Sequence, residues 1–152
     1  MRLTETVLQW LKAEEWEEQP EVNEEEQASS TSFAYAIDDF SLKCYFECHE
    51  RGEVFKLFMY FLDTKVPEKR LDEVQKLVEV VSMGSPIGQL HLLRDRRVIR
   101  FYAAIDVENA SFEPAHITNL LNAGVRTMTA QLPRFMAVCF GDKTAEEMLA
   151  DD

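Results

Sequence analysis

The chain has 152 residues, 46% of them hydrophobic and 29% charged, which is ordinary for one globular domain with its own core. No apolar run approaches the roughly 20 residues of a membrane span, and the first residues lack the basic and apolar segments of a secretory signal. We therefore expect a cytoplasmic protein. The net charge is −12, and the acidity lies mainly in residues 1–30 and in an acidic tail, 142–152. Such a chain repels nucleic acid and anionic membranes as a whole, so neither is an expected partner.

Apolar residues at helical spacing predict a first helix over residues 4–16, with Thr4 as its N-cap. The Glu-rich stretch that follows, residues 17–31, has few apolar residues, which predicts a mobile acidic loop. An alternative is that this loop attracts a basic partner. A short strand is expected over residues 32–37.

Two alternating segments, residues 42–48 and 55–61, predict a β-hairpin around the two-residue loop Arg51-Gly52. In this register every inward pair is apolar: Cys48 with Phe55, Phe46 with Leu57, Cys44 with Met59, and Leu42 with Phe61. The other side of the hairpin carries Tyr45, Phe58 and Tyr60. An exposed aromatic patch of this kind often marks a contact site, although the protein's own loops or helices could equally cover it. We take these three residues as the candidate partner-binding or dimer interface.

A second helix is predicted over residues 67–81, with Pro67 in its first position and Gly84 and Pro86 after its end. A second hairpin then follows, residues 87–93 and 98–105, around Asp95-Arg96. Its register places Leu90 opposite Phe101 on one side. On the other side it groups three residues that could contact an anion or a small ligand: His91, Arg100 and Tyr102.

Four arginines cluster in this second hairpin: Arg94, Arg96, Arg97 and Arg100. A basic cluster can grip phosphate or an acidic peptide. The plainer interpretation is a solvated hairpin end, which could meet the protein's own acidic loop.

A long helix is expected from Pro114 to about Gly141, weakened by Gly124 and kinked or broken at Pro133. A short final helix, 145–150, is capped by Thr144. The predicted order is α-β-β-β-α-β-β-α. It indicates a single α+β domain over residues 1–152, with a mainly antiparallel sheet and helices packed on one face.

Catalytic patterns are absent: there is no phosphate-binding glycine loop, no Gly-x-Ser-x-Gly elbow and no His-Glu-x-x-His helix. The three histidines are isolated in sequence. Cys44 and Cys48, four apart in a strand, lie too far from each other for a disulfide or a shared metal. Asp38-Asp39 could bind Mg²⁺, but two aspartates at a strand end are more typical of a turn. We expect no catalytic residue, no metal and no cofactor, and hence no enzyme.

From Val66 onward the chain resembles the YbjN-like family of bacterial proteins. The resemblance lies in motifs that open elements: Val66-Pro67, Ile87-Gly88-Gln89-Leu90, Phe112-Glu113-Pro114 and a tail at Thr144-Ala145-Glu146-Glu147. It implies a sensory transduction regulator with a fold similar to that of type III secretion chaperones. These chaperones bind extended segments of partner proteins and are commonly dimers. The family has no assigned catalytic residues.

The leading hypothesis is therefore a non-enzymatic, chaperone-like or regulatory protein-binding module that acts as a homodimer and binds a segment of a partner protein. The alternative is a small-ligand sensor or enzyme whose site lies between the sheet and the long C-terminal helix, near His91, Arg100 and Tyr102. Nucleic-acid binding through residues 94–100 is a third possibility, which the acidic ends oppose.

Overall fold

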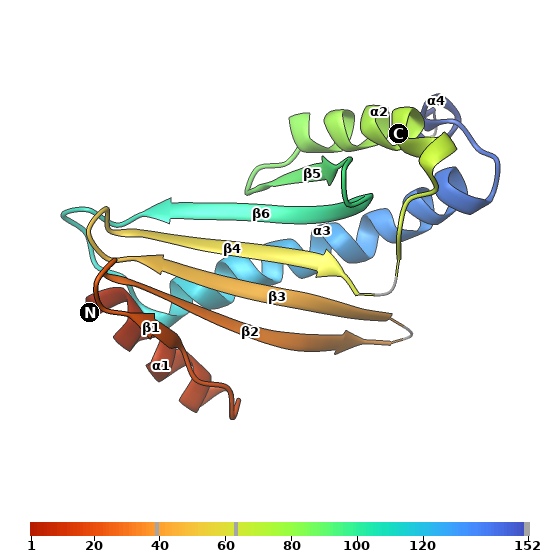
Figure 1. Cartoon of the computed structure of the whole chain (residues 1–152). Coiled ribbons are helices and arrows are strands. Elements are labelled where there is room, and N and C mark those ends of the chain that lie inside the picture. The colour runs from red at the N-terminus through yellow and green to blue at the C-terminus, as the bar shows by residue number, and fades with distance from the viewer. Residues whose placement is uncertain (39, 63, 151–152) are drawn as a thin grey trace.

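An antiparallel sheet with helices on one face forms the protein, as the computed structural model shows for residues 1–38, 40–62 and 64–150 (Figure 1). Among these residues the sheet has six strands in the order β1-β2-β3-β4-β6-β5. The elements in chain order are α1 (Arg2–Ala13), β1 (Glu21–Asn23), β2 (Ala28–Ile37), β3 (Phe40–His49), β4 (Val54–Phe61), a 3-10 turn (Glu68–Arg70), α2 (Leu71–Met83), β5 (Gln89–Leu93), β6 (Val98–Asp106), α3 (Pro114–Phe140) and α4 (Ala145–Leu149). The predicted α+β class is confirmed, with one strand more than expected.

Both hairpins have the predicted register. In the first, Cys48 faces Phe55 and Tyr45 faces Phe58. In the second, Leu90 faces Phe101. Alternation fixes these pairings, because a shift by one residue would move every apolar side chain to the opposite face of the sheet.

The prediction of a loop over residues 17–31 is wrong at two places. Residues 21–23 form β1, which pairs with residues 28–30 of β2. Ser29 and Thr31 are buried in β2 although both are polar. Burial is tolerated because hydroxyl groups find partners inside the fold: the Ser29 and Thr4 hydroxyls lie 2.6 Å apart. The polar composition of residues 28–31 therefore led the sequence analysis to place them in a loop, although they are the first four residues of β2.

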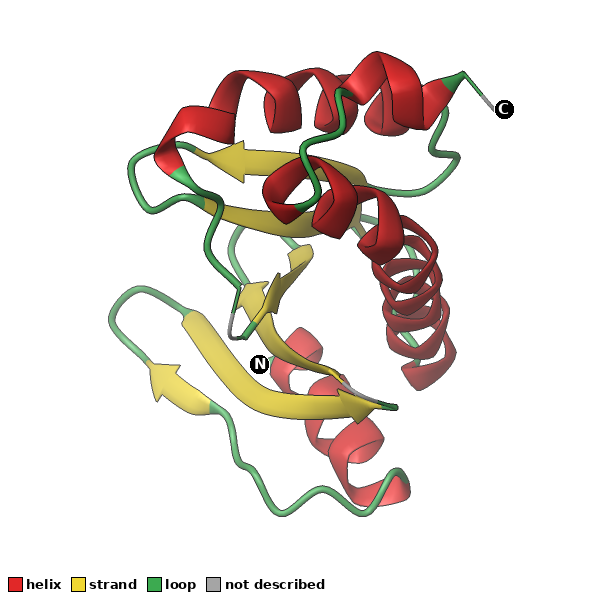
Figure 2. Ribbon diagram, turned by 90° about the vertical axis from the view of Figure 1, so that its right-hand side faces the viewer, coloured by secondary structure: helices red, strands yellow, loops and turns green. Residues whose placement is uncertain are grey.

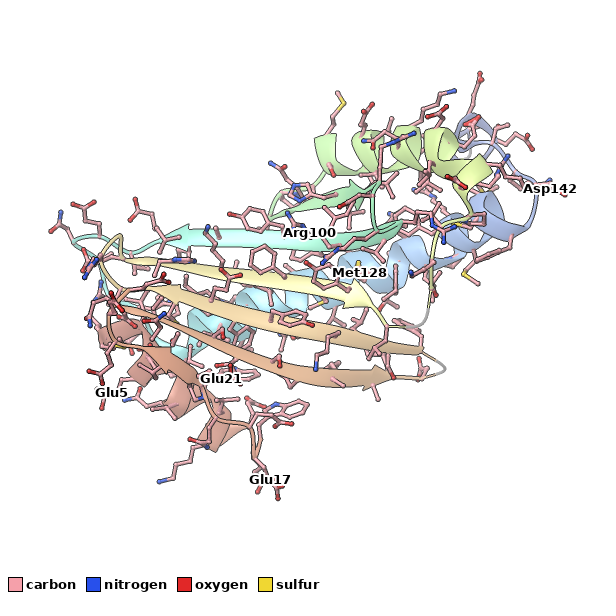
Figure 3. The ribbon with its side chains drawn as sticks, viewed as in Figure 1. Glu5, Glu17, Glu21, Arg100, Met128 and Asp142 are labelled. Carbon is pink, nitrogen blue, oxygen red and sulfur yellow. The ribbon has the colours of Figure 1, made fainter. Side chains whose placement is uncertain are left out.

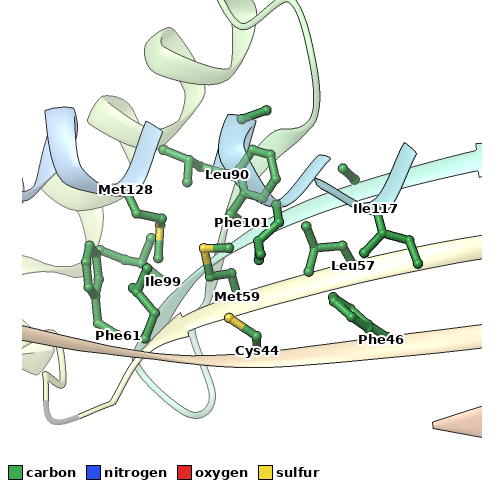
Figure 4. Close-up of a cluster of buried hydrophobic side chains, with 14 of the residues drawn as sticks. Cys44, Phe46, Leu57, Met59, Phe61, Leu90, Ile99, Phe101, Ile117 and Met128 are labelled. Carbon is green, nitrogen blue, oxygen red and sulfur yellow. The ribbon is translucent and has the colours of Figure 1, made fainter. Parts of the chain in front are cut away.

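The core lies between the sheet and the helices α1 and α3, which cover the same face (Figures 1 and 2). Figure 4 shows its centre, where Met59 and Phe101 meet side chains from α3 such as Ile117 and Met128. A Cβ on Gly124 would come within 2.9 Å of both Met59 and Phe101. The glycine that weakens the helix is therefore what lets α3 approach the sheet. Pro133 lies inside α3, which continues to Phe140 without a break.

The start of α1 is capped by a side chain distant in sequence. The expected N-cap, Thr4, lies inside the helix, which begins at Arg2. The carboxylate of Glu50, in the turn between β3 and β4, accepts hydrogen bonds from the backbone N–H groups of Leu3 and Thr4, both at 2.9 Å. It also accepts one from the Thr4 hydroxyl, at 2.6 Å. A tertiary contact thus satisfies donors that a helix start otherwise leaves without partners.

The two edges of the sheet differ. At the β5 edge the Ser82 hydroxyl of α2 donates to the Leu90 carbonyl at 3.0 Å and accepts from the Leu90 N–H at 2.9 Å. At the other edge β1 covers only residues 28–30 of β2. Residues 31–37 of β2 have no strand partner on their outer side within the described parts of the chain.

None of the helices that the structure describes combines the length and the hydrophobicity needed to cross a membrane.

Candidate functional site

The face of the sheet opposite α1 and α3, which we call the open face, carries both groups of residues that the sequence singled out. Tyr45 lies on β3, Phe58 and Tyr60 on β4, and Arg100 and Tyr102 on β6. The pairing of β4 with β6 places Phe58 opposite Tyr102 and Tyr60 opposite Arg100. Figure 3 labels Arg100 on β6, on the side of the sheet away from α3. Two sets taken from separate hairpins therefore form one continuous surface.

The aromatic rings of the open face are in mutual contact. The rings of Tyr45 and Tyr60 meet edge to face, with centroids 5.7 Å apart. Those of Phe58 and Tyr102 lie 5.2 Å apart, and the His91 ring stacks on Tyr102 at 5.6 Å. Such pairs stabilise each other beyond their buried area, so the surface is ordered before anything binds.

Arg100 lies at the centre of this aromatic surface and is held by uncharged groups. Its guanidinium carbon lies 5.1 Å from the centre of the Phe58 ring. Its Nε donates to His91 Nδ1 at 3.1 Å, and one of its terminal nitrogens lies 3.4 Å from the Tyr60 hydroxyl. Burial, and secondly the charge of Arg100, lowers the pKa of His91, which favours the neutral ring that can accept this hydrogen bond.

A hollow of about 1100 Å³ opens on this face, where β4 ends beside the β5–β6 turn. Tyr45, Phe58 and Tyr60 line it, together with six charged residues: Lys43, Lys65, Arg96, Arg100, Glu47 and Asp95. Arg96 lies over the Tyr60 ring and Lys43 over the Tyr45 ring, at 5.7 and 5.8 Å from the centroids. The hollow therefore combines aromatic surface with an excess of positive charge.

The expected placement of a ligand site between the sheet and the long helix is wrong. α3 packs on the core face, where Gly124 lies against Phe101. Arg100 and Tyr102 neighbour Phe101 in β6, so alternation turns both to the opposite face. Only Arg100 of the predicted trio lines the hollow, while His91 and Tyr102 lie beside it.

The arginine cluster is divided by the fold. Arg94 forms an ion pair with Asp72 of α2, at 2.8 Å, rather than with the acidic N-terminal region. Arg96 lines the hollow with Arg100. Sequence reasoning missed Lys43 and Lys65 as members of this basic set. Lys43 faces Tyr60, and only the pairing of β4 with β6 places Tyr60 beside Arg100.

Among the described residues, the histidines and the aspartate pair that the sequence singled out do not gather into one site. No three His, Cys, Asp or Glu side chains in this part of the chain come together as metal ligands would. His49 pairs with Glu47 at 3.1 Å, and His116 Nδ1 accepts from the Glu113 N–H at the start of α3. Of the Asp38-Asp39 pair, Asp38 has a left-handed backbone (φ 47°), as turns allow, and Asp39 lies outside the described residues.

Comparison with known proteins gives a likeness of fold alone. No family model matches the chain, and no curated protein matches its sequence. Among solved structures, that of YbjN from E. coli, described as a candidate transcription regulator, matches with a TM-score of 0.53 and 8% identity, over 84% of this chain and 86% of YbjN. The structure of the ExsC–ExsE complex matches with a TM-score of 0.49 and 14% identity, over 86% of this chain and 94% of the other. The fold that the sequence resemblance implied is therefore confirmed: the chain has the α+β fold of YbjN.

Proposed function

We propose that the protein is a non-enzymatic binding module, chaperone-like or regulatory, that acts as a homodimer and holds an extended segment of a partner protein on its open face. One observation carries the proposal: Tyr45, Phe58 and Tyr60 lie together on the face of the sheet that α1 and α3 leave uncovered. YbjN, whose fold the chain shares, is described as a candidate transcription regulator.

The chemistry of the open face suits a polypeptide. Aromatic side chains contribute much of the binding energy of protein interfaces, since they offer a large contact area at a small entropic cost. Tyr45 keeps 38% of its surface exposed, so a bound segment would remove apolar area from water. The hollow is wide and bordered by strands rather than enclosed, which suits an extended chain better than a small molecule.

Site-specific photo-cross-linking tests the proposal. A benzophenone amino acid is placed at Tyr45 in one variant and at Leu8 of α1 in another. Leu8 is a matched control because it is 40% exposed and lies on the helix of the opposite side. In extracts of the source organism, we expect the Tyr45 probe to cross-link to one defined segment, located by mass spectrometry, and the Leu8 probe not to reach that segment.

A second variant replaces all three aromatic residues, Tyr45→Ser, Phe58→Ser and Tyr60→Ser, with folding checked by circular dichroism. It should lose affinity for the segment identified by cross-linking. If it binds that segment as the parent protein does, or if both probes mark the same segment, docking on the open face is refuted. Light scattering tests whether the protein is a homodimer. A monomer at micromolar concentration would refute the proposed homodimer.

A further inference from the structure

The hollow on the open face carries charge opposite in sign to that of the chain, and this points to the chemistry of its partner. We infer that the hollow binds an acidic extended segment, whose carboxylates meet the basic side chains while apolar residues between them lie on the aromatic rings. The inference rests on the proposed function and narrows it to one class of partner.

The charge of the hollow departs from that of the whole chain. The chain has 16 basic and 28 acidic residues. The hollow reverses this ratio, with four basic residues and two acidic ones among those that line it. Salt screens charges beyond about 8 Å at physiological ionic strength, so a segment in contact with the hollow senses mainly these nearby groups.

The basic residues of the hollow have no carboxylate partner in the described parts of the chain. Four of the basic residues elsewhere form ion pairs: Arg2 with Glu53, Lys76 with Glu73, Arg94 with Asp72, and Lys143 with Glu147. Lys43, Arg96 and Arg100 instead lie over aromatic rings. In a chain with surplus acidic residues, positive charges left without an internal carboxylate are available to an external one.

Arg100 is the anchor that the geometry favours. Arginine carries five N–H donors, of which Nε is used by His91 and one terminal nitrogen is directed at Tyr60. The remaining donors are free to bind a carboxylate, with which guanidinium forms two parallel hydrogen bonds. Because ring contacts and neutral acceptors already fix the side chain, binding orders little that was mobile, and the entropic cost is small.

Fluorescence anisotropy with defined peptides tests the inference. Three labelled peptides share one design, in which an apolar residue alternates with Glu, Gln or Lys and a proline at each end limits aggregation. We expect the Glu peptide to bind most tightly and the Lys peptide most weakly. Arg100→Gln should weaken binding of the Glu peptide about tenfold or more, and leave that of the Gln peptide nearly unchanged.

Lys56→Gln is the matched control. Lys56 lies on the same face of β4 and loses the same charge, but it does not line the hollow. It should change the affinity less than about twofold. Arg96→Gln provides a second test at an exposed position where folding is not at risk.

The outcomes separate this inference from the proposed function. Equal affinity for the Glu and Gln peptides, both lost in the triple serine variant, overturns acidic selection while docking on the open face stands. No binding of any peptide, or tighter binding of a single-stranded oligonucleotide than of the Glu peptide, overturns the inference. The proposed function is refuted as well only by its own tests: no open-face cross-link, the same segment marked by both probes, or unchanged binding of that segment by the triple serine variant.

Discussion

Removal of the Glu50 carboxylate is expected to destabilise the protein strongly. Glu50 satisfies the backbone N–H groups of Leu3 and Thr4 and the Thr4 hydroxyl. Loss of an N-cap costs about 1 kcal/mol, and hydrogen bonds to a charged group contribute about 1.5–3 kcal/mol each. Water can reach part of this helix end, which offsets some of the loss. We therefore expect Glu50→Ala to lower the free energy of unfolding by about 2–4 kcal/mol.

Chemical denaturation with urea, followed by circular dichroism, measures this change, and the melting temperature should fall by about 10 °C. The control compares two variants in the same turn that lose the same charge: Glu53→Gln and Glu50→Gln. Glu53 pairs with Arg2 at 3.0 Å, but both side chains are more than a third exposed, so this ion pair should contribute at most about 1 kcal/mol. If the Glu50 variants are no less stable than the Glu53 variant, the argument for a tertiary helix cap is refuted.

Three further predictions follow from the core and from the open face. Gly124→Val should destabilise the protein by about 2 kcal/mol or more in urea denaturation, because its added carbons would collide with Phe101; an unchanged midpoint would contradict the close packing of α3. Burial raises the pKa of Cys44 to about 12 and of Cys48 and Cys139 to about 11, so a thiol reagent at pH 8 should label these residues only after unfolding. The lowered pKa of His91 means that the unfolded chain takes up a proton at this ring at a higher pH than the folded chain does. The contribution of His91 to the free energy of unfolding is therefore complete above pH 6.5 and is lost as the pH falls toward the folded-state pKa. By NMR its titration midpoint should lie below 6.5 and rise in Arg100→Gln, but not fully, since burial is the larger cause; an unchanged midpoint would contradict the contact with Arg100.

The parts of the fold that sequence could predict are those in which local pattern and tertiary environment agree. The register of both hairpins follows from the alternation of apolar and polar residues together with a short turn, since each inward-facing pair is apolar on both strands. The aromatic set Tyr45, Phe58 and Tyr60 follows from the same register.

The parts that could not be predicted depend on contacts between distant segments. The pairing of β4 with β6, which places Tyr60 beside Arg100, crosses the whole of α2 and β5, and no local signal encodes it. In the sequence, Glu50 and Asp72 have the pattern of ordinary surface residues. Only the fold places Glu50 at the start of α1 and Asp72 beside Arg94. The candidate site was therefore predicted as two separate sets of residues, one on each hairpin. Only the three-dimensional structure shows that the two sets lie side by side on one surface.

The unequal edges of the sheet limit how copies of the protein can associate through backbone pairing. Fibres built from sheets need two open edges in each molecule, so that every added copy leaves an edge for the next one. Here the Ser82 hydroxyl bonds the Leu90 backbone groups at the β5 edge, whereas at the other edge β1 and residues 31–37 of β2 have no outer strand partner among the described residues. Pairing of two such edges around a two-fold axis consumes both of them. Strand addition that used this edge alone would therefore stop at two copies, because the pairing leaves neither copy with that edge free.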